Sequence, residues 1–343
     1  MREPWDQPSH YKTKKMALGS VTLRLYIYSG TEGSYSDADL KYTLSKNIIS
    51  GQSNIVLEIG ELVRDYLDVT FNGTYTSSAK WVAAVVTYFD TDGEEYTYSS
   101  PETFNYIALD GYGYFEDGIN PELQRHALIS ADNIYLPEGT AGKLPIFAEG
   151  VGKVRIDSSD TEITDNGNSN QKIQYITIPA DSSTIQVYDT DDTTLLKTIT
   201  VNNICEPKFT PYKVVFQNKF GALQDLWFFK KTTESFNVTD ETFKRNIIDS
   251  GTVTYNLDET QNQRYNVNAK TKLTLNTGFL KENMNQTIEE LFLTENAWID
   301  YGGNVLPIIP VSKSMTFKTS LNDRLTDYTI DFEFGFDKIN NIR

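Results

Sequence analysis

The sequence predicts a mainly β protein of tandem antiparallel β-sandwich-like domains, the last an α+β domain with one helix packed on a sheet. The strongest observation is residues 328–336, where large apolar side chains alternate with small or polar ones. Such alternation indicates a strand with one buried face. Composition agrees, because 18 Phe and 21 Tyr, with many Thr, Asn and Asp, supply what strands and turns use. A third observation is one helical apolar pattern, across residues 282–294.

The terminal strand has a predicted partner just before it in the chain. Met315 and Phe317 alternate with polar residues, and a polar turn follows, which together predict a hairpin. In that hairpin Lys318 would lie across from Asp331 or Glu333. A cross-strand pair of opposite charges contributes roughly 0.2–1 kcal/mol.

The predicted helix 282–294 lies upstream of the hairpin. Asn283 and Gln286 are placed to cap its start. We expect it to cover the aromatic face of the hairpin, because one helix on an antiparallel sheet buries both apolar surfaces. Its apolar residues at helical spacing are Leu280, Met284, Ile288, Leu291 and Phe292.

Shorter patterns divide the rest of the chain. The predicted segments are an N-terminal arm 1–16, a β-sandwich-like domain 17–110, an extended aromatic loop 111–143, a small all-β module 144–206 and a C-terminal β-rich domain 207–343.

In the first domain we predict strands 21–28, 54–59, 81–89, 95–98 and 104–109, and a short helix 61–67. In the module we predict strands 144–147, 154–156, 173–178, 184–188 and 195–201, the first an edge strand because of Pro145. Further strands are predicted at 214–216, 225–229, 253–257 and 272–275.

Two segments carry too few periodic apolar residues to build a core. The arm 1–16 is interpreted as flexible or ordered by a partner, with an untethered terminus as the alternative. The loop 111–143 is punctuated by glycine and carries exposed rings, which could anchor a protein partner, stack on sugar or fold back to plug a sandwich. The candidate partner contacts are Tyr112, Tyr114, Phe115, Trp5 and His126.

Charge and residue counts narrow the function classes. With 31 basic and 47 acidic residues the net charge is −16, so a phosphate-gripping nucleic-acid binder is not expected. Cys205 is the only cysteine, which excludes an intrachain disulfide. His10 and His126 are the only histidines, so a Ser-His-Asp triad or a typical zinc ligand set is not expected either. We therefore predict no enzyme activity, no metal and no cofactor.

Two acidic turns resemble metal loops only in part. The turn 90–95 begins like a calcium loop, but its glycine comes too early and Pro101 stands where the distal Glu belongs. An Asp-Gly pair between two strands is the usual sequence of a hairpin turn, and 189–192 is interpreted in the same way. Paired carboxylates for sugar hydrolysis stay open, because their separation is spatial.

The first residues lack the apolar region of a secretory signal, and no run approaches 18 apolar residues. We expect a chain that folds in a cytosol and does not enter a membrane.

Four runs of the sequence have a familiar composition: 218–231 (NKFGALQDLWFFKK), 271–277, 321–334 (LNDRLTDYTIDFEF) and, in style, 54–81. These runs resemble virion proteins of tailed phages that infect Bacteroidetes, in particular the crAss-like group. The resemblance covers most of the chain as scattered short runs and not as an invariant motif.

The resemblance implies a non-enzymatic, ring-forming component of the phage neck or tail, assembled in the bacterial cytoplasm and kept in the virion. Its implied partners are identical subunits, other neck and tail proteins, and genomic DNA that passes through the channel without specific binding. An acidic channel would repel DNA and let it slide. The alternatives are a receptor- or glycan-binding tail or adhesion module and, less supported, a polysaccharide-degrading enzyme.

Overall fold

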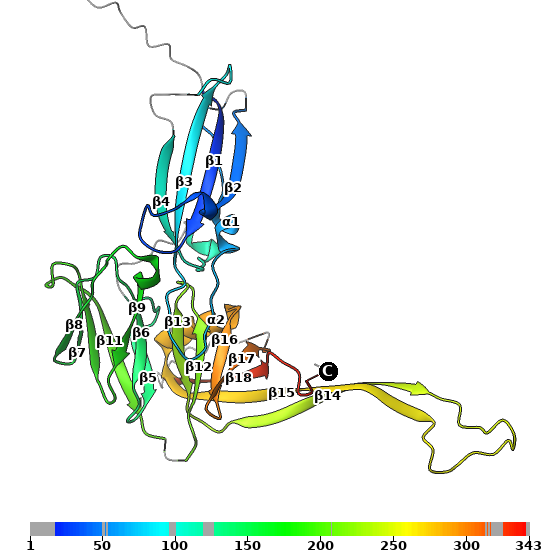
Figure 1. Ribbon diagram of the computed structural model, residues 1–343. Helices are drawn as coiled ribbons and strands as arrows, with labels where there is room; N and C mark the ends of the chain where they lie inside the picture. The colour runs from blue at the N-terminus through cyan, green and yellow to red at the C-terminus, as the bar shows by residue number, and fades with distance from the viewer. Residues whose placement is uncertain are drawn as a thin grey trace, which may run out of the picture. The chain divides into compact units, whose positions relative to one another are not determined.

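The computed structural model describes residues 18–49, 52, 54–95, 101–118, 127–206, 208–312, 314, 316 and 325–340. The chain is mainly β, as predicted, with several antiparallel sheets and its main helix near the C-terminus. It forms two compact units (Figure 1). Unit 1 comprises residues 1–67 and 80–108, and unit 2 comprises 68–79 and 109–343.

Unit 1 is built on a four-stranded antiparallel sheet in the order β2-β1-β3-β4. The strands are β1 (Leu18–Tyr28), β2 (Leu40–Asn47), β3 (Lys80–Asp90) and β4 (Glu102–Ala108). Helix α1 (Gly60–Arg64) lies where the short helix was predicted and buries Val63 against one face of the sheet. The alternating apolar residues of β1 and β3 fill that core, among them Leu23, Leu25, Val82 and Ala84.

The predicted strand 54–59 is wrong. This segment has no regular structure, and the second strand is β2, which comes earlier in the chain. Leu57 and Ile59 nevertheless pack against the unit 1 core, so their alternation reflects burial without a ladder partner. β2 was missed because it is an edge strand with mostly exposed side chains. The predicted strand 95–98 lies largely outside the described residues.

The small module of unit 2 has two sheets around one core. The larger sheet has the order β5-β11-β10-β7-β8, and β6 pairs with β9 in a sheet of their own. Its strands are β5 (Asn133–Pro137), β6 (Gly142–Phe147), β7 (Lys153–Ile156), β8 (Ser159–Glu162), β9 (Ile173–Ile178), β10 (Thr184–Tyr188) and β11 (Leu195–Ile204). The predicted loop 111–143 therefore has to be corrected, since β5 and the start of β6 lie inside it. β5 escaped prediction because it is short and pairs in parallel with β11, about seventy residues later.

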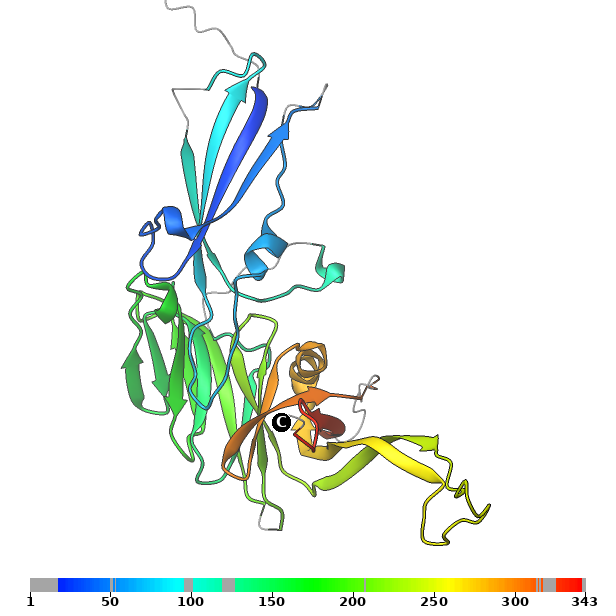
Figure 2. The same ribbon diagram turned by 45° about the vertical axis from the view of Figure 1, so that its right-hand side comes forward.

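The rest of unit 2 is a seven-stranded sheet, in the order β13-β12-β16-β17-β18-β15-β14, with a helix on one face (Figure 2). Its strands are β12 (Tyr212–Gln217), β13 (Leu223–Phe228), β14 (Thr233–Lys244), β15 (Asn262–Lys281), β16 (Ala297–Tyr301), β17 (Asn304–Pro310) and β18 (Leu325–Phe334). A 3₁₀ turn (Glu282–Met284) leads into helix α2 (Asn285–Leu293), which confirms the predicted helix. Other 3₁₀ turns are Asp37–Asp39, Phe115–Asp117 and Ser169–Gln171.

The predicted packing of the helix is also confirmed. Met284, Ile288 and Leu291 are buried in one cluster with Ile330 and Phe332 of β18. The side chains predicted to cap the helix do not do so, because Met284 is its N-cap and makes no side-chain hydrogen bond there.

The terminal hairpin takes a different form from the prediction. β18 pairs with β15 and β17, and the expected partner strand around Phe317 lies largely outside the described residues. Asp331 forms its ion pair with Lys272 of β15, at 2.8 Å. The predicted strand 253–257 is wrong too, since these residues lie in turns and irregular structure.

Unit 2 also includes a segment that the chain supplies early. Residues 68–79, here called the strap, lie between two pieces of unit 1 in sequence but pack in unit 2. Phe71 is buried with Val215 and Leu223 of the seven-stranded sheet, and its ring lies 5.8 Å from that of Trp298. The strap therefore contributes to the core of unit 2.

Candidate interaction surface

The clearest candidate surface is an arm that extends from the seven-stranded sheet, residues 236–268. β14 and the outer half of β15 form a two-stranded ribbon that runs away from the rest of unit 2 in both views (Figures 1 and 2). Every residue of β14 is exposed. A two-stranded ribbon without a packed face is only marginally stable in water. Its exposure therefore points to a role in contact and not in holding the core.

The arm is rich in exposed apolar side chains. Among the described residues, nine of the 21 exposed large hydrophobic residues lie in it. They are Phe236, Val238, Phe243, Ile248, Val253, Tyr255, Leu257, Tyr265 and Val267. Isolated apolar side chains on a surface are ordinary, whereas a concentration on one projecting element marks an interaction site.

Both faces of the ribbon carry apolar residues. Phe236 pairs with Thr271 and lies on the face of the buried Leu273, two residues along. A register shift between Thr239 and Glu241 interrupts the ladder. Because side chains alternate, Phe243 lies on the opposite face from Phe236, where its ring contacts Tyr265 at 5.6 Å. A partner can therefore contact the arm from either side.

Sequence reasoning missed the arm because its apolar residues have no regular period. Phe236 and Val238 of β14 stand two residues apart, but Phe243 falls out of this alternation, so the segment lacks the sustained signal of a half-buried strand. A stretch without alternation, lying between strands whose apolar residues do alternate, was the one sequence signal that could have pointed to the arm.

Of the aromatic residues in the loop that were predicted as partner contacts, only some are exposed. Tyr112 and Tyr114 are half-buried and their rings pack edge to face at 6.0 Å. The N–H of Tyr112 donates to the carbonyl of Lys219 at 2.8 Å. Gly111 comes so close to this carbonyl that a Cβ would meet it at 2.6 Å, so glycine is required there. The structure therefore favours, for Tyr112 and Tyr114, the alternative in which the loop folds back onto its own domain and does not present these rings to a partner.

Phe115 is the exception in this loop, because its side chain is fully exposed and remains a predicted partner contact. Trp5 and His126 lie outside the described residues. The five candidate contacts are therefore not brought together as one site among the residues that the structure describes.

A buried carboxylate lies beside the two tyrosines. Glu290 of α2 is fully buried; one of its oxygens accepts a hydrogen bond from the Ser130 hydroxyl and the other has no hydrogen-bond partner. Burial raises the pKa of Glu290, and Ser130 and Lys219 offset this only in part. Burial likewise raises the pKa of Tyr112 and of Tyr114. The site holds polar groups in a dry environment.

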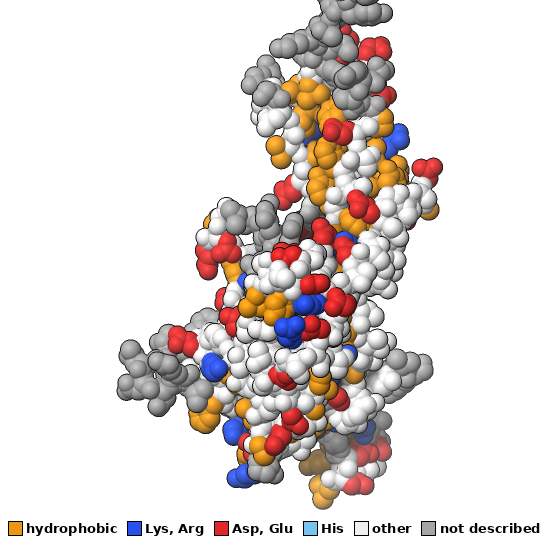
Figure 3. All heavy atoms as spheres, turned by 90° about the vertical axis from the view of Figure 1, so that its left-hand side faces the viewer, with side chains coloured by type: hydrophobic (Ala, Val, Ile, Leu, Met, Phe, Trp, Pro, Cys, Tyr) orange, Lys and Arg blue, Asp and Glu red, His pale blue; other side chains and the backbone are white. Residues whose placement is uncertain are grey.

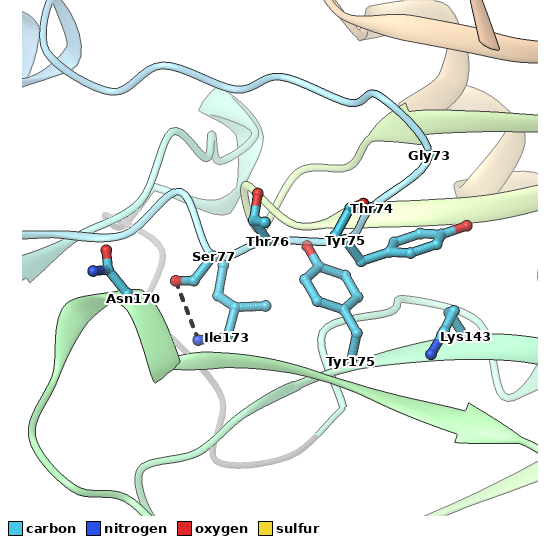
Figure 4. A pocket seen from close by; sticks show the side chains of 9 residues that line it. All are labelled: Gly73, Thr74, Tyr75, Thr76, Ser77, Lys143, Asn170, Ile173 and Tyr175. Carbon is cyan, nitrogen blue, oxygen red and sulfur yellow. Dashed lines mark hydrogen bonds between the residues drawn. The ribbon is translucent and has the colours of Figure 1, made fainter.

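A groove of about 630 Å³ separates the strap from the β6-β9 sheet (Figure 4). It is lined by Gly73, Thr74, Tyr75, Thr76, Ser77, Lys143, Asn170, Ile173 and Tyr175. The Tyr75 hydroxyl donates to Asp225, and the Tyr175 hydroxyl accepts from the Leu223 N–H at 2.9 Å. Lys143 donates to Thr177 at 2.7 Å. Of these bonds, only that of Tyr75 fastens the strap to β13; the bond of Tyr175 joins β9 to β13, and that of Lys143 joins β6 to β9.

The acidic turns are closed by their own backbone. Asp90 accepts hydrogen bonds from the N–H groups of Asp92 and Glu94, both at 2.9 Å. Asp191 accepts from the N–H of Thr193 at 2.9 Å. Both are hairpin turns, as interpreted from the sequence. Within the described residues, no three His, Cys, Asp or Glu side chains are grouped to hold a metal ion.

No protein-family profile matches the chain, and no curated protein matches its sequence. In the described part of the chain, no helix is both long enough and apolar enough to cross a membrane.

Proposed function

We propose that this protein is a non-enzymatic structural component of a bacteriophage virion, a ring-forming subunit of the neck or tail that helps to build the DNA channel between portal and tail. The observation that carries the proposal is the arm, an exposed apolar element that extends beyond its own fold. A subunit of an assembly needs such an element, whereas a monomeric soluble protein rarely exposes one.

Two further observations support this function. The runs at 218–231 and 321–334 resemble virion proteins of crAss-like phages. The net charge of −16 would repel DNA from the wall of a channel built from many copies. In a closed ring, different patches of one subunit meet its two neighbours, and a projecting arm is suited to be one of these patches.

The test is a map of the native particle. We expect identical copies around a central axis, with virion localisation between portal and tail. A monomeric decoration on the outside of the particle would contradict the ring, and a trimeric spike would favour host recognition.

Glycan or receptor binding is the second candidate, and the groove beside the strap is the observation that favours it. Tyr175 offers an aromatic wall, and Thr74 and Asn170 offer polar groups near it. A glycan array with the full chain tests this candidate. Binding that Thr74→Val and Asn170→Ala weaken, while Thr43→Val at an exposed position of β2 does not, would support it over the ring.

A further inference from the structure

We propose that the pair Asn72–Gly73 in the strap is a site of spontaneous deamidation, whereas the pair Asn166–Gly167 in the small module is protected by its hydrogen bonds. These are the only two Asn-Gly pairs in the sequence. The modification does not depend on the proposed function, and water is the only second reactant that it needs.

Deamidation at an Asn-Gly pair begins when the backbone nitrogen of the glycine attacks Cγ of the asparagine. The bond between that nitrogen and Cγ forms, the Cγ–Nδ2 bond breaks, and ammonia leaves with the proton that the glycine nitrogen gives up. Water then opens the five-membered ring. Opening at Cγ gives aspartate in a normal backbone, and opening at the main-chain carbonyl gives isoaspartate, whose backbone is one methylene longer. Glycine favours the attack because no Cβ shields its nitrogen.

In the strap both nitrogen atoms of this reaction are free. Asn72 and Gly73 are exposed. Among the residues that the structure describes, neither the backbone N–H of Gly73 nor the side-chain amide of Asn72 donates a hydrogen bond. The side-chain oxygen of Asn72 accepts from the N–H of Thr74 at 3.1 Å. A donor at this oxygen stabilises the negative charge that develops on it when the nitrogen attacks.

In the small module Asn166 is exposed too, but both nitrogen atoms are engaged. The N–H of Gly167 donates to the Asp165 carboxylate at 3.0 Å, and the side-chain amide of Asn166 donates to Gln171. The carboxylate opposes loss of the proton from this N–H and so opposes formation of the nucleophile. The side-chain oxygen of Asn166 accepts from the N–H of Asn168 at 3.0 Å, as in the strap, so the difference lies in the nitrogen atoms.

The protecting carboxylate is itself held in place. The second oxygen of Asp165 forms an ion pair at 2.7 Å with Lys172, whose side chain is 4% exposed. Figure 3 views the side of the molecule on which the small module lies, and acidic side chains there lie beside basic ones. Loss of a hydrogen bond to a charged group before the attack slows a reaction by about tenfold to a hundredfold. Asn166 should therefore react more slowly than Asn72.

Deamidation would weaken the strap, because two of its anchors flank the reactive pair. Phe71 is buried in the core of unit 2, and the Tyr75 hydroxyl donates to Asp225. The rings of Phe71 and Tyr75 lie 5.0 Å apart. Isoaspartate lengthens the main chain between these anchors, so both contacts cannot keep their present geometry.

The experiment incubates the full chain in mildly alkaline buffer at body temperature and follows the peptides that contain Asn72 and Asn166 by mass spectrometry. Conversion makes a peptide about one mass unit heavier, and electron-transfer fragmentation distinguishes isoaspartate from aspartate. In the folded chain we expect Asn72 to convert at least about ten times faster than Asn166. The same chain in urea is the control. Both pairs should convert there at similar rates, because the protecting hydrogen bonds are lost.

Two variants test the causes. Asp165→Ala frees the N–H of Gly167 and should speed conversion of Asn166 by about tenfold or more. Asn72→Gln should abolish conversion in the strap and leave Asn166 unchanged. Circular dichroism checks that both variants fold, and the comparison of the two pairs in the unmodified sequence needs neither of them.

The isoaspartate form, separated by chromatography, should unfold at a lower denaturant concentration than untreated protein. Equal unfolding of the two forms would overturn the weakening of the strap. Equal conversion of the two pairs in the folded chain, or faster conversion of Asn166, would overturn the difference in protection. A folded chain in which Asn72 stays unconverted, while both pairs convert in urea, would overturn the modification site itself.

Discussion

The two halves of β15 lie in different environments within one continuous strand. In the inner half, Leu273 and Leu275 alternate with exposed or half-buried residues and are buried under α2. In the outer half, residues 262–267 are almost entirely exposed on both faces. The backbone pairing with β14 continues through both halves. Strand formation here does not depend on a buried face, whereas stability does, because apolar burial supplies most of the stabilising free energy.

The comparison extends to the two edges of the seven-stranded sheet. β13 is one edge, and it packs against β5 and β6 of the small module. β14 is the other edge, and its side chains remain in solvent. An edge strand left open over twelve residues can pair with another chain. The covered edge at β13 therefore stabilises unit 2, whereas the open edge at β14 is available for contact with a partner.

The largest expected effect comes from the inner region. Phe332→Ala removes a fully buried ring that packs edge to face with Phe228 at 5.8 Å. We expect a loss of about 3–5 kcal/mol in the free energy of unfolding, measured by denaturant titration. The matched control is Phe236→Ala in the arm, where the ring is 67% exposed. If the two variants differed by less than about 1 kcal/mol, the contrast between core and arm would be wrong.

A second prediction concerns the helix that covers the inner half. Leu291 is fully buried in the same cluster, so Leu291→Ala should cost about 2–5 kcal/mol. Leu293→Ala, at an exposed position of α2, is the control and should change little. A loss below about half a kcal/mol for Leu291→Ala would show that α2 does not pack on the sheet.

A third and smaller effect is expected from Glu290. Because its pKa is raised in the folded protein, the folded state binds more protons than the unfolded state above the ordinary pKa of 4.5. Stability should therefore fall as pH rises from about 4.5 through the raised pKa, and Glu290→Gln should flatten that dependence. Unfolding titrations across this range test it, with Glu289→Gln as control. An unchanged slope in Glu290→Gln would show that this carboxyl does not titrate abnormally.

The smallest effect on stability is expected in the arm itself. Phe243→Ser and Leu257→Ser should change the unfolding free energy of the isolated chain by less than about 0.5 kcal/mol, because neither side chain is buried. Limited proteolysis should cut isolated protein within the arm and spare it in assembled particles. Equal cleavage in both states would indicate that the arm has no partner.

The elements with a buried face could be predicted from the sequence, whereas the exposed arm could not. The strand at 328–334 and helix α2 were predicted because each has one covered face that imposes a period on the sequence. The arm has no covered face, and so its sequence carries no period. Tyr112 could not be placed either, because its position depends on Lys219, about a hundred residues later. The candidate interaction surface was therefore the part that the sequence revealed least.

The strap has a consequence for the order in which the protein is made. Phe71 leaves the ribosome early, but Trp298 and Val305, which help to cover it, follow roughly 230 residues later. At about 5–20 residues per second, the strap waits on the order of 10–50 s for these partners. Unit 2 therefore cannot complete its core until nearly the whole chain has been synthesised. During that interval the aromatic side chains of the strap are exposed to chaperones and to other nascent chains.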